Sequence, residues 1–248
     1  MTPLLRKPLF IAAATALALL PACAQPGGGA SKAEIEKIVH EYIVEHPEVI
    51  EEALIALSQR EQAAAAEAAK AAIAANKDKL YSLAGDHAIG PEDAKITVVE
   101  FFDYRCGYCK RSVDWVRGLP EEYDGQVRVV FKELPIFGGI SETAALAALA
   151  AGNQGKYFEM HFALMNLKSN DDLTEQKIDE LAAGLGINVA RMRADMKSPP
   201  IVKQLAEMKA LGDALGVSGT PGFFIGDLHV EGANTQAIEA AIEEALKG

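Results

Sequence analysis

Two cysteines three positions apart are the residues of this sequence best suited to chemistry. Cys106 directly precedes, and Cys109 lies in the first turn of, residues 107–118, whose pattern predicts a helix. Positions i and i+3 share one helix face, so the two sulfurs can form a disulfide. Unpaired amides and positive potential at a helix N-terminus stabilise a thiolate. We therefore expect Cys106, at the exposed end, to be the nucleophile, and Cys109, one turn later and shielded, to resolve the mixed disulfide.

A structural cross-link is a poor explanation for this pair, because it closes a very short loop and restrains the unfolded chain little. Two cations, Lys110 and Arg111, follow the cysteines directly. They are expected either to add positive charge near the thiols or to be simply solvated.

A glutamate interrupts the apolar run that precedes the cysteines. Residues 96–102, ITVVEFF, are predicted to form a strand buried on both faces. Alternation places Glu100 on the face of Phe102, and a carboxylate there is costly unless it has a task. Buried beneath the thiols, it would have a raised pKa and could accept the proton of Cys109, directly or through a water. The alternative is a glutamate at the sheet edge that points to solvent.

A threonine–proline pair, Thr220-Pro221, directly precedes another predicted strand. Proline is poorly tolerated inside a central strand but suits its first residue. The spacing alone leaves open whether the peptide bond is cis or an ordinary trans turn bond.

The surrounding pattern is that of an α/β domain. Residues 126–134 are predicted to be a strand parallel to 96–102, and 141–215 a helical insertion. Gly226-Asp227 is predicted to join two strands of a hairpin, and 235–248 to form an amphipathic helix. The segment 85–94 reads as a turn-rich connection.

The N-terminus has the features of an export signal, assigned to residues 1–24. A short basic region precedes the uncharged, largely apolar run Leu9–Leu20, whose twelve residues are too few to span a bilayer. Cleavage after Ala24 would release a soluble protein into the periplasm. Alternatively, LPAC at 20–23 resembles a lipobox with a lipidated Cys23. In either case the remaining cysteine pair lies where disulfides persist.

A helical arm is predicted over residues 31–78, preceded by a flexible linker. Ser31 and Glu34 form a capping box, and apolar residues then recur at helical spacing. The arm has more apolar surface than it can cover alone. It is either an arm that packs on its own domain or, as we favour, an oligomerisation stalk.

Together these motifs resemble the DsbA-like thioredoxin-fold family. The resemblance rests on FFDYRCGYCK after a buried strand acid, on GTPGFFIG near the C-terminus and on the helices between them, over roughly residues 80–247. The helical arm and the Cys-Gly-Tyr-Cys sequence resemble the ScsC/Com1-type branch. The expected architecture is an α/β thioredoxin-like domain, residues 80–248, with a helical insertion and a preceding N-terminal helical arm.

The resemblance also implies site roles. It implies a cis Pro221 packed against Cys106 and a Thr220 backbone that holds the extended substrate peptide. Gly107 and Tyr108 join them as substrate-binding residues. Strong DsbA oxidants carry Pro-His at these two positions, whereas Gly-Tyr, like threonine before the proline, resembles DsbC-type isomerases. Without a cation there the disulfide should be less oxidising, which favours shuffling or reduction over pure oxidation.

The predicted function is an exported thiol:disulfide oxidoreductase of isomerase or oxidase type, with no cofactor beyond the Cys106–Cys109 disulfide. Its expected partners are misfolded exported proteins, a membrane redox protein and further copies of itself. The excess of 35 acidic over 24 basic residues argues against nucleic acid. The alternatives are a reductase fed by a membrane electron donor and a copper-binding protein that uses the reduced pair.

No resident metal site is expected, because the five histidines show no ligand spacing. Each of them is expected to be a surface residue or a core residue with its hydrogen bonds satisfied. They are His40, His46, His87, His161 and His229.

Overall fold

The computed structural model describes residues 30–247, and the chain divides into two compact units, residues 1–58 and 59–248. The predicted signal peptide and Cys23 lie outside the described residues. Helix α1 (Lys32–Glu45) begins at a complete capping box, in which the Ser31 amide donates to Glu34 Oε2 at 2.8 Å and the Glu34 amide to Ser31 Oγ at 3.3 Å. The predicted helix start is confirmed.

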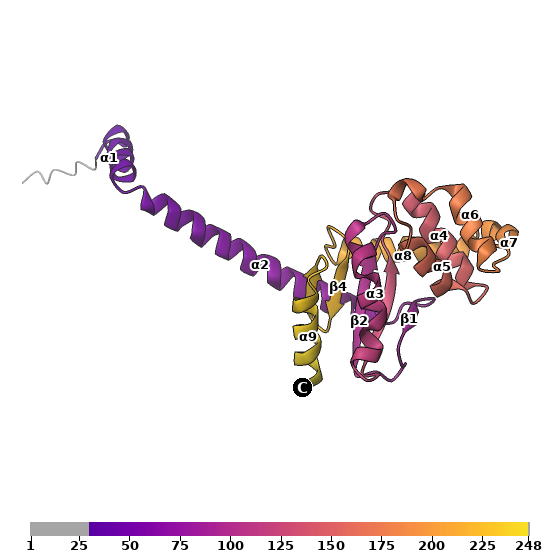
Figure 1. Cartoon of the computed structure of the whole chain (residues 1–248). Helices are drawn as coiled ribbons and strands as arrows, with labels where there is room; N and C mark the ends of the chain where they lie inside the picture. Colours follow the sequence, from indigo (N-terminus) through magenta and orange to yellow (C-terminus); the bar gives the residue numbers. More distant parts are fainter. Residues whose placement is uncertain (1–29, 248) are drawn as a thin grey trace, which may run out of the picture. The chain divides into compact units, whose positions relative to one another are not determined.

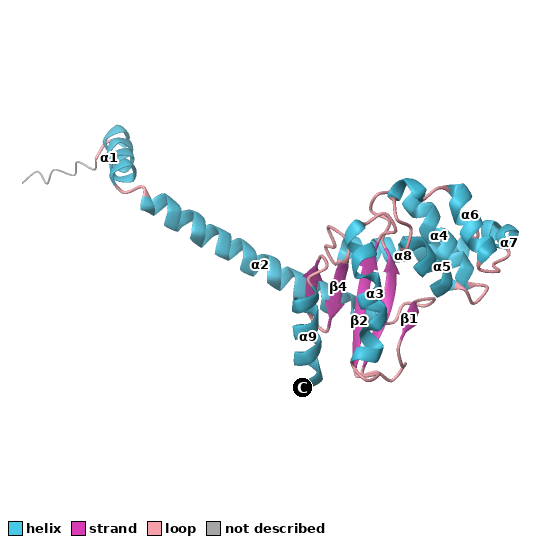
Figure 2. Ribbon diagram, viewed as in Figure 1, coloured by secondary structure: helices cyan, strands magenta, loops and turns pink. Residues whose placement is uncertain are grey.

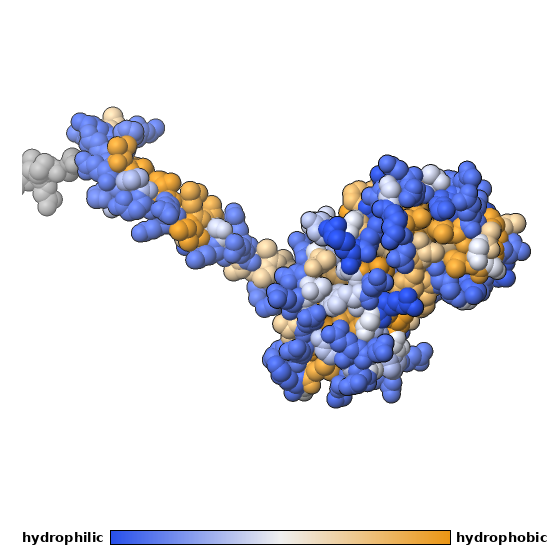
Figure 3. All heavy atoms as spheres, viewed as in Figure 1, coloured by the Kyte–Doolittle hydropathy of each residue, from blue (hydrophilic) through white to orange (hydrophobic). Residues whose placement is uncertain are grey.

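The first unit exposes a run of large apolar side chains. Helix α1 has no buried residue, and helix α2 (Glu48–Tyr81) begins in the same unit. Apolar surface follows both helices in the space-filling view (Figure 3). The side chains concerned are each 45–65% exposed: Ile35, Ile38, Val39, Tyr42, Val44, Ile50, Leu54, Ile55 and Leu57.

A five-stranded sheet forms the centre of the second unit. Its strands are β1 (His87–Ile89), β2 (Ile96–Phe102), β3 (Val127–Glu133), β4 (Gly222–Ile225) and β5 (Leu228–Glu231). The order is β1-β3-β2-β4-β5, with β2 and β3 parallel and the other neighbours antiparallel. The predicted parallel pair and the C-terminal hairpin are confirmed.

Strand β1 was not expected, because the segment 85–94 reads as a turn-rich connection. Its His87 pairs with Phe131 of β3, and the His87 ring stacks on Tyr157 at 3.7 Å. The strand is only three residues long, and all three are partly exposed. Its sequence therefore shows no alternation of apolar and polar residues that would predict a strand. Its conformation depends on pairing with β3 rather than on local pattern.

Helices cover the sheet and fill the connection between β3 and β4 (Figures 1 and 2). Helix α3 runs four residues beyond the predicted 107–118 and contains Pro120. A short 3₁₀ helix, Asn170–Asp172, lies inside the insertion. The helices are α3 (Gly107–Glu122), α4 (Ile140–Gly152), α5 (Tyr157–Met165), α6 (Glu175–Gly184), α7 (Val189–Asp195), α8 (Pro199–Ala214) and α9 (Thr235–Lys247).

Each sheet face has its own core. The alternation of β2 sends Val98 and Phe102 into the larger core, with α3, α9 and the insertion helices, and sends Phe101 into the smaller one. There Phe101 packs with Ile73 and Leu80, the buried residues of α2, and with the end of α8. Strand β2 is therefore covered on both faces, as predicted for its apolar run.

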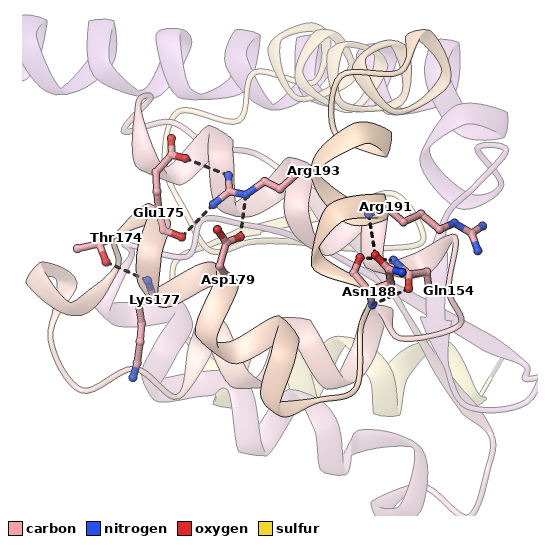
Figure 4. A network of polar contacts seen from close by, with 8 residues as sticks. All are labelled: Gln154, Thr174, Glu175, Lys177, Asp179, Asn188, Arg191 and Arg193. Carbon is pink, nitrogen blue, oxygen red and sulfur yellow. Dashed lines mark hydrogen bonds and ion pairs between the residues drawn. The ribbon is translucent and has the colours of Figure 1, made fainter.

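A polar network holds the outer helices of the insertion together (Figure 4). The Arg193 guanidinium of α7 bonds two carboxylates of α6, Asp179 at 2.7 Å and Glu175 at 3.0 Å. At the start of α7, the Asn188 amide donates to Gln154 Oε1 at 2.9 Å. These contacts fix α6 and α7 to each other and to the end of α4.

One buried ion pair ties β3 to the segments before the sheet. Lys132 Nζ lies 2.6 Å from Asp86 Oδ2 and also donates to the Lys79 carbonyl oxygen at 3.0 Å. The two side chains are 0% and 7% exposed. Because both charges are removed from water, loss of either one would leave the other buried and unpaired.

Candidate active site

Cys106 is the N-cap residue of α3. Its backbone is extended, with φ −73° and ψ 114°, and its sulfur accepts a hydrogen bond from the Cys109 amide at 3.4 Å. When Cys106 is protonated, its thiol donates to the Thr220 carbonyl oxygen at 3.0 Å. Both thiols are free. The prediction that the helix begins at the cysteine pair is confirmed, and it places the sulfur at the unpaired amides of the first turn.

The surroundings of Cys106 lower its pKa to about 6. The largest cause is a hydrogen bond from the Cys109 thiol to the sulfur anion. Burial opposes it, and the Thr220 side chain and the backbone amides of Cys109 and Tyr108 add to it. The Thr220 hydroxyl is buried and has no other partner among the described residues, so it is free to turn toward the thiolate. At neutral pH, Cys106 is therefore mostly ionised.

The two cations after the pair are engaged elsewhere. Lys110 Nζ donates to the Leu167 carbonyl oxygen at 3.0 Å. The guanidinium of Arg111 lies over the Tyr108 ring, 4.3 Å from its centroid. The groups that lower the Cys106 pKa are hydrogen-bond donors around the sulfur, not these two side chains.

The two cysteines differ in proton affinity more than in exposure. Cys109 is 1% exposed, and burial, followed by its hydrogen bond with Cys106 and the charge of Glu100, raises its pKa far above the usual range. Cys106, expected at an exposed end, is itself only 5% exposed. That expectation was wrong because it considered the helix alone, whereas the Thr220 carbonyl lies on the sulfur from a loop more than a hundred residues away.

Glu100 lies in the middle of the sheet. It pairs with Phe131 of β3 on one side and Phe223 of β4 on the other, and it is 3% exposed. The alternative of a solvent-facing edge glutamate is therefore wrong. Burial, and then the negative charge of Cys106, raises the Glu100 pKa to about 8. At neutral pH most of this carboxyl is protonated, and its proton affinity depends on the charge of the nucleophile.

The Thr220-Pro221 peptide bond is cis, as the family resemblance implied. The Pro221 carbonyl oxygen accepts a hydrogen bond from the Gly232 amide at 2.8 Å, which ties the loop to the residue that follows β5. With the Thr220 carbonyl on Cys106, the structure brings together the distant motifs at 100–109 and 220–221.

The central dipeptide of the pair faces solvent. Tyr108 is 61% exposed, and a Cβ added to Gly107 would lie 3.4 Å from Arg111 Nη1. Both residues are exposed beside Cys106, and their role as substrate-binding residues stays a prediction.

Sequence reasoning missed a buried polar cluster behind the nucleophile. Tyr104 and Tyr157 donate to Glu133 Oε1 at 2.9 and 3.0 Å, and Tyr104 also hydrogen-bonds with His161 Nδ1 at 3.1 Å. Burial raises the pKa of Glu133 well above its usual range and lowers that of His161 to about 3. His161 was expected to be satisfied, but its buried Nε2 has no partner among the described residues.

Asp103 extends this anchoring toward the insertion. Its carboxylate accepts hydrogen bonds from the Arg105 amide at 2.7 Å, the Ser141 hydroxyl at 2.8 Å and the Phe137 amide at 3.1 Å. The residues just before Cys106 are thus fixed to the β3–α4 loop and to α4. The available signal was a polar residue directly after a buried apolar run, whereas Glu100 lies inside that run.

No group of three or more His, Cys, Asp or Glu side chains within residues 30–247 is arranged to hold a metal ion. None of the helices in this range is long and apolar enough to cross a membrane.

Two family models match the chain. The thioredoxin model covers residues 82–244, and the model described as "Copper resistance protein ScsC N-terminal domain" covers residues 32–64. The chain spans about a quarter of the length of the curated relatives that it matches, which are Na⁺/H⁺ antiporters named NhaA, with 25%, 25% and 26% of their lengths covered.

Three solved structures resemble the chain closely in fold. A thioredoxin-like oxidoreductase from Silicibacter pomeroyi DSS-3 is 37% identical, over 70% of this chain and 99% of that one, with TM-score 0.65. The catalytic domain of Proteus mirabilis ScsC is 30% identical over 72% and 99%, with TM-score 0.65. The thiol-disulfide exchange protein α-DsbA2 from Wolbachia pipientis is 28% identical over 73% and 97%, with TM-score 0.65.

The cysteine pair at a helix N-terminus, the cis-proline loop, the matching thioredoxin model and the ScsC-type arm agree with one another. The chain belongs to the thioredoxin family, as a DsbA-like protein of the ScsC type.

Proposed function

We propose that the chain is an exported thiol:disulfide oxidoreductase that rearranges disulfide bonds in protein substrates. Thiol–disulfide oxidoreduction is the activity class of its family. The observation that carries the finer proposal is the pairing of an ionised Cys106 with a buried, protonated Cys109 and an acid beneath them. One sulfur can attack while the other is held back until it is needed.

The first step is attack of the Cys106 thiolate on one sulfur of a substrate disulfide. A bond forms between Cys106 and that sulfur, the substrate disulfide breaks, and the other substrate sulfur leaves as a thiolate. An extended substrate backbone would pair beside the Thr220 carbonyl, as the family resemblance implies.

The second step requires a proton to leave Cys109. Formation of the mixed disulfide removes the negative charge of Cys106, which is one of the two causes of the raised Glu100 pKa. Glu100 then gives up its proton to solvent water more readily and, as a carboxylate, accepts the proton of Cys109. The Cys109 thiolate attacks Cys106, a Cys106–Cys109 disulfide forms, and the substrate sulfur departs.

Isomerisation needs the first step more than the second. A freed substrate thiolate can attack another disulfide of the same substrate and finally displace Cys106 in its reduced form. Oligomerisation through the arm would set several active sites around one substrate. The exposed apolar side chains of residues 35–57 support this, because such a surface on a soluble chain marks an interaction site.

The proposed setting is the periplasm. It follows from the export signal and is supported by a periplasmic thioredoxin-like protein of Salmonella enterica serovar Typhimurium, 26% identical over 69% of this chain and 96% of that one, with TM-score 0.58. The proposed partners are misfolded exported proteins and a membrane redox protein that keeps the pair reduced.

Copper binding is a second candidate. The arm matches a family model described by copper resistance, and the two thiols are free and adjacent. Thiolates are suitable ligands for Cu(I). Tight stoichiometric binding of Cu(I) to the reduced protein, without any exchange activity, would favour this candidate.

Reactivation of scrambled ribonuclease tests the main proposal. The reduced protein should restore ribonuclease activity catalytically, whereas Cys106→Ala should not. Good oxidation of a dithiol peptide without any reactivation would instead identify an oxidase. Reduction of substrate disulfides with neither activity would identify a reductase.

The arm is tested separately by light scattering after size exclusion. Ile38→Glu, at a side chain 60% exposed in α1, should lower the mass per particle. His40→Glu places the same charge at another exposed position of α1 and should leave the mass unchanged. A monomeric wild type would overturn the proposed oligomer.

A further inference from the structure

Two arginine–aromatic stacks flank the nucleophile. The guanidinium carbon of Arg111 is 4.3 Å from the ring centroid of Tyr108, and that of Arg105 is 5.7 Å from the centroid of Phe137. Both rings belong to the surface, with Tyr108 61% and Phe137 53% exposed. The stacks come from different elements, the first turns of α3 and the β3–α4 loop.

Both stacks are close to Cys106. Arg105 is the residue directly before it in the chain. Arg111 reaches back along α3, so that its Nη1 would be 3.4 Å from a Cβ at Gly107. That distance is an ordinary van der Waals contact, so the guanidinium lies beside the residue that follows the nucleophile.

Neither arginine has a carboxylate partner among the described residues, although the chain has 35 acidic residues. Arg193 makes the contrast clear, since it holds two carboxylates (Figure 4). The ion pairs within residues 30–247 do not include Arg105 or Arg111, and Arg105 Nε is buried without a hydrogen-bond partner. Within the described part of the chain, neither guanidinium is therefore held by an ion pair.

Stacking prepares a guanidinium to bind an anion. An aromatic face restrains the side chain and leaves the in-plane N–H groups free, and these match a carboxylate in two-pronged geometry. A substrate cysteine bonded to Cys106 would bring its neighbouring residues close to the Arg105 and Arg111 guanidinium groups. An acidic neighbour would be attracted there, whereas a lysine would be repelled.

We propose that Arg105 and Arg111 select substrates that carry an acidic side chain next to the cysteine attacked by Cys106. This inference rests on the proposed function, because it names the substrate class of the same site. The occupant is an anionic segment of an exported protein.

The test uses three disulfide-bonded peptides that differ only in the residue beside the cysteine, which is Glu, Gln or Lys. The rate of mixed-disulfide formation with the reduced full-length protein is measured by stopped flow. Exposed ion pairs are weak, so the Glu peptide should react only about three- to tenfold faster than the Lys peptide. Raising the salt to about 0.5 M should bring the ratio toward one.

Variants assign the effect to the two arginines. Arg105→Gln together with Arg111→Gln should reduce the Glu-to-Lys rate ratio to about one. Arg117→Gln is the matched control, because Arg117 is also exposed, lies on the same helix and stacks on an aromatic ring, Phe162, at 4.8 Å. It lies about 16 Å along α3 from Cys106, at 1.5 Å per residue, and should keep the wild-type ratio.

The outcomes separate this inference from the proposed function. Iodoacetamide, which is neutral, reports the thiolate fraction of Cys106 in each variant, and the rates are compared at equal thiolate fraction. Exchange with all three peptides at similar rates, or an unchanged ratio in the double variant, overturns the selection of acidic substrates alone. No exchange with any peptide overturns the proposed function itself.

Discussion

The dependence of Cys106 on Cys109 gives a sharp prediction. Replacing Cys109 by alanine removes the thiol whose hydrogen bond is the largest cause of the low Cys106 pKa. The backbone amide at position 109 and the contacts of Thr220 remain. The Cys106 pKa should therefore rise from about 6 without returning to the value of a free cysteine.

The size of this rise follows from the strength of the lost bond. A hydrogen bond to a charged group contributes about 1.5–3 kcal/mol. Since one pKa unit corresponds to about 1.4 kcal/mol, the Cys106 pKa should rise by roughly one to two units, to about 7–8. At pH 7 the thiolate fraction would fall from about nine-tenths to between about one-half and one-tenth.

The assay is the pH dependence of iodoacetamide alkylation, checked by thiolate absorbance near 240 nm. Cys109 does not interfere in the wild type because its own pKa is raised far above the usual range. Cys109→Ser is the matched control, because the hydroxyl can still donate to the sulfur anion and should hold the pKa near that of the wild type.

If Cys109→Ala still titrates near 6, the backbone and Thr220 are sufficient, and the explanation from the Cys109 thiol is refuted. A wild-type Cys106 that titrates like a free cysteine would refute the description of the site as a whole.

Three further predictions concern the acid, the ion pair and pH. Glu100→Gln should slow the Cys109 resolving step roughly a hundredfold and abolish its rise with pH, as measured by decay of a mixed disulfide; in the wild type this rise should fall below pH 8, because the mixed disulfide lacks the Cys106 charge that helps to raise the Glu100 pKa to about 8. Asp86→Asn leaves Lys132 buried and unpaired, so urea unfolding should show a loss of about 3–5 kcal/mol. The free energy of unfolding of the reduced protein should fall, relative to that of the oxidised protein, as pH falls through about 6. The reason is that the pKa of Cys106 is lower in the folded state, so acid forces a proton onto its thiolate. Equal pH profiles of the unfolding free energy for the two forms would contradict this.

The local sequence pattern was sufficient to predict a helix or strand where a single segment determines that element. The apolar run 96–102 predicted β2 with its bounds, and the cysteine spacing predicted the start of α3. The capping box at Ser31 predicted the start of α1. The cis bond at Pro221 could be expected only from the family resemblance, because the local sequence suits cis and trans turns equally.

Features that need two distant segments could not be derived from the sequence. Tyr104 meets Glu133 of β3 across 29 residues and His161 across 57, and His161 lies in a helical insertion whose path no local pattern gives. Lys132 is fully buried in an apolar strand only because Asp86 comes from another segment. The low exposure of Cys106 has the same origin, since the loop at Thr220 covers it.

The two outer strands of the sheet bear on how such a protein handles its clients. Strand β1 has three residues and β5 has four, so each margin of the sheet offers only a short row of open backbone groups. Unfolded chains tend to pair with long exposed edge strands as additional strands of the sheet, which leads to aggregation. Under the proposed function, short outer strands would protect the protein, because they leave little open backbone for an unfolded substrate to pair with away from Cys106.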